Sequence, residues 1–179
     1  MEDPRRRPSR GFTLVEFMIV LAVAAVLLGT AAPDFSRLLS ERAAATQAGQ
    51  FMAALRFARA EAMKRGQAVG VCASDPAAPG TRCLTGFAGA DWRFGWIVFA
   101  GADGAVPPAA AAQILRVQQP LARSDGVAGT RRVMEFTAAG FSTDAAGHFL
   151  FAAAGGAKPV MVCVSKQGKP RVAPAGVCS

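Results

Sequence analysis

One acidic side chain, Glu16, stands inside an otherwise apolar run near the start of the sequence. Every other side chain from Phe12 to Ala32 is uncharged, and a helix over residues 12–32 is about as long as the ~30 Å hydrocarbon core of a bilayer. A carboxylate in such a helix costs about 2.5 to 3.5 kcal/mol on insertion scales and is normally kept for a partner. The run is therefore predicted to span a membrane, with Glu16 available for an ion pair.

Four arginines immediately precede this run: Arg5, Arg6, Arg7 and Arg10. Positive charge on one flank predicts a cytoplasmic N-terminus and an external location for everything after Pro33. Cleavage between Gly11 and Phe12 would create an amine, and that amine on a neighbouring subunit could neutralise Glu16.

Residues 11–16 read Gly-Phe-Thr-Leu-Val-Glu, which resembles the prepilin motif of type IV pilins and type II secretion pseudopilins. The resemblance implies cleavage after Gly11 by a prepilin peptidase, methylation of Phe12 and guidance of filament assembly by Glu16. It also implies a single-pass inner-membrane protein with a periplasmic C-terminal domain, whose partners are other pilins or pseudopilins. Gly29 and Pro33 match helix-loosening positions of the family.

Two other interpretations of the N-terminus remain open. One is a secretory signal peptide that ends at Ala31, which an acidic residue near the start of the apolar run disfavours. The other is a plain single-pass anchor, for which nothing physical requires this motif.

Composition limits the chain to one membrane helix and one globular domain. The sequence has 179 residues and is 52% hydrophobic, which leaves roughly 110 to 140 residues for a domain of ordinary size. The net charge is +8, and removing the first 11 residues leaves 16 basic minus 10 acidic residues, or +6. A basic balance favours non-specific attraction to nucleic acid or anionic lipid, although a basic proteome would produce the same balance.

The four cysteines all follow the apolar run, where an oxidising compartment lets disulfides persist. They allow three pairings, and we favour the local ones, Cys72 with Cys83 and Cys163 with Cys178, because each closes a short loop. Each bond would stabilise the domain by about 3 kcal/mol on the chain-entropy model. Zinc is the competing interpretation, but the sequence has no Cys-x-x-Cys and a single histidine, His148, so no metal and no cofactor is predicted.

After Pro33 the apolar residues recur at near-helical spacing and predict an amphipathic helix over about residues 35–65, ended by Gly66. Its expected apolar stripe consists of Phe35, Leu38, Leu39, Phe51, Met52, Leu55 and Met63. Asp34 is a candidate N-cap, and residues 12–65 could form one long helix, loosened at Pro33. The stripe is expected to pack on a sheet.

Strand patterns follow from residue 67 onward. We predict strands at 68–72, 92–99, 114–117, 132–136, 148–151 and 160–164, with residues 124–129 as a connection. The predicted fold class is α+β, a type IV pilin-like fold with a long N-terminal helix packed on an antiparallel β-sheet domain. The expected divisions are a leader (1–11), a transmembrane and filament-core helix (12–33), its amphipathic half (34–66) and a periplasmic β-rich domain (67–179).

A narrower resemblance covers most of the chain after the leader. The helix from Phe51 to Ala62, the strand that ends at Cys72 and the strand at residues 95–99 are similar to the FimT/GspH group of minor pilins and pseudopilins. FimT-type minor pilins that take part in DNA uptake bind DNA through a C-terminal arginine-rich loop of the form Gly-Arg-x-Arg. Residues 168–171 resemble it with Lys169 in place of the first arginine, which implies weaker contacts because lysine lacks the bidentate fork.

The C-terminal tail has basic residues and no acidic residue after Gly155. Lys166, Lys169 and Arg171 lie between Cys163 and Cys178, and a disulfide there would hold the cations at fixed spacing for phosphate contacts with double-stranded DNA. Arg131 and Arg132 form a candidate accessory patch. The competing interpretation is a solvated basic hairpin that only covers the sheet.

Catalysis is not predicted. The sequence has no Gly-x-Ser-x-Gly, Walker or His-Glu-x-x-His motif, and His148 is expected at an edge or turn. Trp92 and Trp96 are expected on one strand, facing the core.

The sequence thus predicts a minor pilin of a type IV pilus, with DNA binding for natural transformation as a hypothesis and a type II secretion pseudopilin without DNA binding as the alternative.

Overall fold

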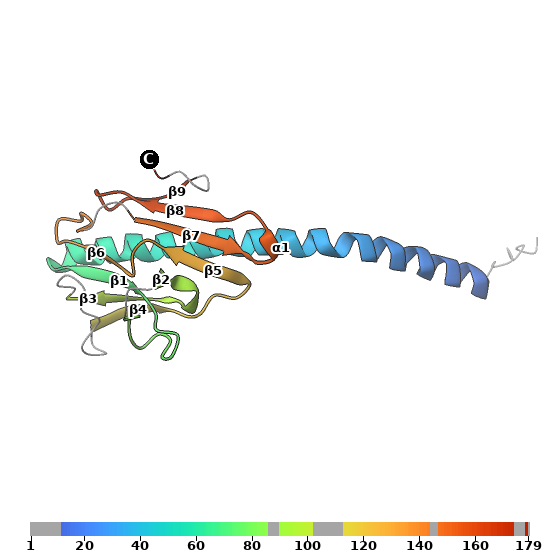
Figure 1. The fold of residues 1–179 in the computed structure, drawn as a ribbon, viewed down its shortest axis with the longest axis horizontal. Coiled ribbons are helices and arrows are strands. Elements are labelled where there is room, and N and C mark those ends of the chain that lie inside the picture. Colours follow the sequence, from blue (N-terminus) through green and yellow to red (C-terminus); the bar gives the residue numbers. More distant parts are fainter. Residues whose placement is uncertain (1–11, 86–89, 102–112, 144–146, 174–177, 179) are drawn as a thin grey trace, which may run out of the picture. The chain divides into compact units, whose positions relative to one another are not determined.

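The computed structural model describes residues 12–85, 90–101, 113–143, 147–173 and 178, except the side chains of residues 28–34. Its elements, in chain order, are α1 (Leu14–Arg65), β1 (Val69–Ala73), β2 (Ala90–Asp91), η1 (Trp92–Phe94), β3 (Trp96–Ala100), β4 (Ile114–Gln118), β5 (Ser124–Gly129), β6 (Val133–Phe136), β7 (Gly147–Ala153), η3 (Ala154–Gly156), β8 (Val160–Val164) and β9 (Pro170–Ala173) (Figure 1). The chain divides into an N-terminal unit, Met1–Ser36, and a C-terminal unit, Arg37–Ser179.

The N-terminal unit contains the start of α1, and its large apolar side chains are exposed. Phe12, Leu14 and Val15 are 86%, 75% and 64% exposed, and the exposed apolar residues continue to Leu27. A helix that is apolar on all sides needs an apolar environment from outside the chain.

The membrane span expected over residues 12–32 is not confirmed. Within the part of the chain that the structure describes, no helix is both long enough and apolar enough to cross a membrane. The side chains of residues 28–32 of that span lie outside the described set. The candidate N-cap Asp34 lies within the continuous backbone of α1, so the prediction that a helix begins there was wrong.

The C-terminal unit is built on the second half of α1. A stripe of buried side chains spaced by three or four residues runs along it: Ala44, Ala48, Phe51, Leu55, Ala58 and Ala62. The predicted stripe was right for Phe51 and Leu55 but wrong for Phe35, Leu38, Leu39 and Met63, which are exposed. Alanine forms most of the stripe because a small side chain lets the helix lie close to large strand residues.

The helix ends where the sequence predicted. Arg65 is its last residue, and Gly66 follows with φ +65°, donating its N–H to the carbonyl of Ala62 at 3.0 Å. A left-handed glycine directly after the last turn is a common helix terminator.

Two antiparallel sheets share this helix. Their strand orders are β4-β3-β1-β6 and β2-β5-β7-β8-β9, and side chains from both join α1 in one core. The predicted α+β pilin-like fold is confirmed (Figure 1).

Three strand predictions need correction. Residues 92–99 do not form one strand, because Trp92–Phe94 are a 3-10 turn and Gly95 has φ +92° before β3 begins. Both tryptophans are nevertheless buried in the core, as expected. Residues 124–129, predicted as a connection, form β5, and Pro170 and Arg171, expected in a loop at residues 168–171, begin β9.

Candidate functional site

The structure describes all of the N-terminal motif at residues 11–16 except Gly11. Gly11 lies outside the described residues, and Phe12 and Glu16 are exposed. The Glu16 N–H donates to the Thr13 Oγ1 at 3.2 Å, so Thr13 caps the helix and Glu16 takes the third helical position, as in a capping box. An acidic residue in the first turn also suits the positive end of the helix dipole.

Two disulfides close loops in the C-terminal unit. Cys72 joins Cys83 and Cys163 joins Cys178, with Cα atoms 5.6 and 5.7 Å apart. Among the described residues, no cluster of His, Cys, Asp and Glu side chains could hold a metal ion. His148 is exposed within β7, an internal strand paired with β5 and β8, so the expectation of an edge or turn position was wrong.

Asp75 organises the loop that the first disulfide closes. Its Oδ1 accepts the Ala77 N–H at 2.8 Å and its Oδ2 accepts the Arg82 Nε–H at 2.6 Å. The Ala77 amide and the Arg82 guanidinium hold the pKa of the Asp75 carboxyl below its usual range.

This lowered pKa predicts acid sensitivity. The ionised carboxyl stabilises the fold above its unfolded pKa of about 4, and that contribution is lost as the pH falls through the lower folded value. We therefore expect the melting temperature of the wild type to fall more steeply below about pH 4 than that of Asp75→Asn. Thermal unfolding between neutral and acid pH measures the difference, and parallel curves for the two proteins would contradict the assignment.

The basic tail forms a hairpin of β8 and β9. Its turn is closed by the Gly168 N–H donating to the Ser165 carbonyl at 2.8 Å and the Ser165 N–H donating to the Lys169 carbonyl at 3.2 Å. Lys166, Lys169 and Arg171 are exposed, and Cys163 on β8 connects the hairpin to Cys178.

Arg131 and Arg132 lie elsewhere, directly before β6 in the four-stranded sheet, and both are half-buried. Their carbonyls accept hydrogen bonds from the Trp92 Nε1 at 3.0 Å and the Ala73 N–H at 2.9 Å. Their backbone therefore has a structural role.

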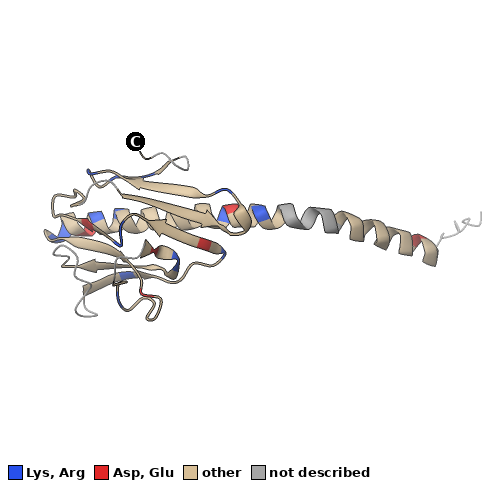
Figure 2. Ribbon diagram, in the orientation of Figure 1, with Lys and Arg blue, Asp and Glu red and all other residues tan. Residues whose placement is uncertain are grey.

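Two further arginines lie beside the hairpin and were not predicted as site residues. Arg56 and Arg59 on α1, with Lys169, line a cavity of about 410 Å³ whose other walls are Ala60, Met63, Gly168 and Pro170. Figure 2 shows basic positions on the C-terminal part of α1 and on the β8–β9 turn. The i, i+3 spacing of Arg56 and Arg59 was visible in the sequence. Only tertiary packing brings the β8–β9 turn, more than 100 residues away along the chain, against these two arginines.

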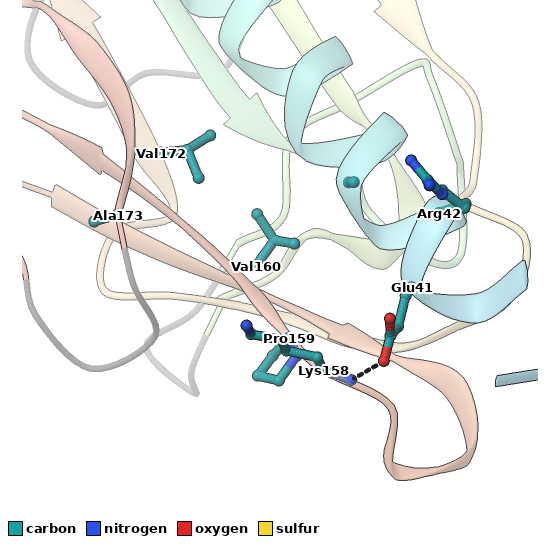
Figure 3. A pocket seen from close by; sticks show the side chains of 8 residues that line it. Glu41, Arg42, Lys158, Pro159, Val160, Val172 and Ala173 are labelled. Carbon is teal, nitrogen blue, oxygen red and sulfur yellow. Dashed lines mark hydrogen bonds between the residues drawn. The ribbon is translucent and has the colours of Figure 1, made fainter. Parts of the chain in front are cut away.

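A second cavity, of about 530 Å³, lies between α1 and the residues at and before the start of β8 (Figure 3). Ala45, Val160, Val172 and Ala173 supply an apolar lining. The Glu41 Oε1 accepts the Lys158 backbone N–H at 3.4 Å, which ties the helix to the start of β8.

Comparison with models of known protein families shows to which family the chain belongs. A family model described as type II transport protein GspH matches residues 47–168, which is more than half of the chain. The chain belongs to the GspH family. A second model, the prokaryotic N-terminal methylation motif, matches residues 6–32, so the predicted pilin-like resemblance is confirmed.

Solved structures support the same fold for this GspH-family chain. The type IV minor pilin FimU of Pseudomonas aeruginosa matches in two crystal forms, at 19% identity in both. The TM-scores are 0.57 and 0.54, and the matches cover 78% and 75% of this chain and 94% and 95% of the FimU chains in those crystals. No curated protein matches the sequence.

The two family matches and the fold make this a minor pilin or pseudopilin of a type IV pilus or a type II secretion system. Such families are structural rather than enzymatic, and they imply cleavage by a prepilin peptidase and assembly with other pilins. The methylation motif is that of a membrane-anchored filament component.

Proposed function

We propose that this GspH-family protein is a minor pilin that enters or initiates a type IV pilus. Residues 1–11 would be the leader, residues 12–33 the membrane and filament-core helix, residues 34–66 its amphipathic half, and residues 67–179 the periplasmic domain. Phe12 would become the methylated N-terminus, with Glu16 paired to the amine of a neighbouring subunit.

The observation that carries the proposal is the exposed apolar start of α1 directly behind the cleavage motif. Phe12, Phe17 and Met18 are 86%, 61% and 61% exposed, so this surface needs lipid before assembly and other helices after it. A pseudopilin of type II secretion would share these features, and the proteins recovered with the filament distinguish the two systems.

N-terminal sequencing of the membrane-extracted protein tests the proposal. We expect a mature chain that begins at Phe12, whereas Gly11→Val should retain the leader because a branched side chain now occupies the cleavage position. Ser9→Ala, also within the leader, is the matched control and should be processed normally. A chain that begins after Ala31 would show signal-peptide cleavage and contradict the proposal.

A second candidate function, double-stranded DNA binding for natural transformation, is favoured by the hairpin. Its three exposed cations, Lys166, Lys169 and Arg171, lie on the turn and on β9, and a disulfide joins Cys163 on β8 to Cys178. Fixed cations of this kind suit contacts to phosphates, which carry no sequence information.

Salt dependence tests DNA binding directly. The full chain in neutral detergent should retard duplex DNA of any sequence, and Lys169→Ala with Arg171→Ala should reduce the slope of log K against log salt by about 1.8, since each phosphate contact contributes about 0.9. The matched double change Lys64→Ala with Arg116→Ala removes two exposed cations elsewhere and should leave the slope intact. Equal slopes in the two double variants would exclude the hairpin as the DNA contact.

A further inference from the structure

Arg59, which lines the cavity between α1 and the β8–β9 turn, has a buried donor without an acceptor. Among the described residues, no hydrogen-bond partner is found for the Nε of Arg59, which is inaccessible to solvent. A buried donor left unsatisfied costs about 1 to 3 kcal/mol, and more when the group is charged. The described part of the chain therefore leaves Arg59 with an unpaired donor.

The backbone around Arg59 leaves little freedom for its guanidinium group. A Cβ atom at Gly140 would lie 3.2 Å from the Arg59 Nε and 2.8 Å from the Met63 Sδ. Gly168 in the hairpin turn approaches Gly140 equally closely, because a Cβ there would lie 2.7 Å from the Gly140 carbonyl oxygen. The close approach of the Gly140 backbone limits the positions open to the Arg59 side chain, which lowers the entropic cost of binding.

The charge of the cavity identifies the ligand as an anion. Among the described residues, its lining includes Arg56, Arg59 and Lys169 and no acidic side chain. The nearby carboxylate of Glu61 on α1 is already bound, with its Oε2 2.6 Å from the Arg65 Nε and its Oε1 3.8 Å from the Lys64 Nζ. Three cations therefore line a space without a counter-charge from the described residues around it.

The remaining walls are apolar and distinguish between anions. Ala60, Met63 and Pro170 line the cavity, and Met63 is 48% exposed. A phosphodiester would leave this apolar surface uncovered, whereas an acidic side chain with an aliphatic neighbour would cover it. Carboxylates also match the planar fork of an arginine guanidinium.

We infer that this cavity binds a glutamate or aspartate side chain, next to an aliphatic residue, from a neighbouring polypeptide. The identity of that polypeptide as another filament subunit rests on the proposed function, but the binding chemistry does not. The site would give the C-terminal unit a lateral contact of its own, independent of the pairing proposed for Glu16.

Peptide binding tests the inference. The probe is a short fluorescein-labelled peptide of alternating leucine and glutamate, added to the full chain in neutral detergent and followed by fluorescence anisotropy, with the leucine–glutamine peptide as reference. We expect saturable binding of the acidic peptide only. Arg59→Gln should weaken binding of the acidic peptide about tenfold or more, as expected for a lost hydrogen bond between charged groups. The affinity of Arg59→Lys should lie between those of the wild type and Arg59→Gln.

Arg37→Gln is the matched control, because it removes one exposed arginine from the same helix, and it should bind within about twofold of wild type. If Arg59→Gln does not fold, Lys169→Gln in the exposed turn carries the test. Equal affinity for both peptides would overturn the inference, and so would equal effects of Arg59→Gln and Arg37→Gln. It would also be overturned if inorganic phosphate or duplex DNA bound in an Arg59-dependent way while the acidic peptide did not bind. N-terminal sequencing reports separately on the proposed function, so the two failures are distinguishable.

Discussion

Replacing Phe51 by alanine is expected to destabilise the C-terminal unit by about 3 to 5 kcal/mol, the usual cost of removing a buried phenylalanine. Phe51 is fully buried on α1, with ring centroids 5.2 Å from Trp92, 5.1 Å from Trp96, 4.7 Å from Phe149 and 5.7 Å from Phe151. Three of these pairs are edge-to-face, a geometry that aromatic rings prefer. The variant would lose contacts to both sheets and leave a cavity where they meet the helix.

Guanidinium unfolding of the oxidised full chain in detergent, followed by tryptophan fluorescence, measures this loss. Phe141→Ala is the matched control, because Phe141 is 54% exposed, and it should change the free energy of unfolding by no more than about 0.5 kcal/mol. A comparable loss in both variants would show that Phe51 is not the centre of the core.

Replacing Glu16 by glutamine is expected to remove the protein from filaments, with a loss of incorporated protein of at least about 100-fold. Removing one partner of a buried ion pair costs about 3 to 5 kcal/mol, and about 2.8 kcal/mol corresponds to a factor of 100. Glutamine also suits the third position of a capping box, so this change removes the charge while it keeps the cap on Thr13. The variant therefore separates the assembly role proposed for Glu16 from its local role in the helix.

The measurement is the amount of the protein in sheared filaments relative to the amount in membranes. Glu16→Asp retains the charge and should restore part of the incorporation, and Thr13→Val, which removes the cap observed at Oγ1, should have a small effect. Normal incorporation of Glu16→Gln, with loss in Thr13→Val, would assign Glu16 to helix capping alone.

Most of the fold could be predicted because its signals are local. The α1 termination at Gly66 follows from backbone preference, and strands β1, β3, β4, β6, β7 and β8 fall on runs of β-branched, aromatic and sulfur-containing residues. The same logic failed at β5, where Ser124, Asp125 and Gly126 are typical of a turn. Pairing with β7 overrides that local preference in the folded chain.

The buried face of α1 shows a different limit. Large apolar residues such as Leu38 and Met63 match helical spacing, but the structure buries small alanines instead. Which side of a helix becomes buried depends on what covers it, and here Trp92 of the 3-10 turn and Phe149 and Phe151 of β7 supply the bulk.

The sequence alone determined what depends on neighbouring residues: the N-terminal methylation motif, the charge on Glu16 and the α+β fold class. Only the tertiary structure decided which distant groups meet. Arg56, Arg59 and Lys169 line the same cavity because the β8–β9 turn packs on Gly140 beside the helix. No local pattern encodes that meeting, since it results from the packing of two sheets on one helix, in which each contact depends on all the others.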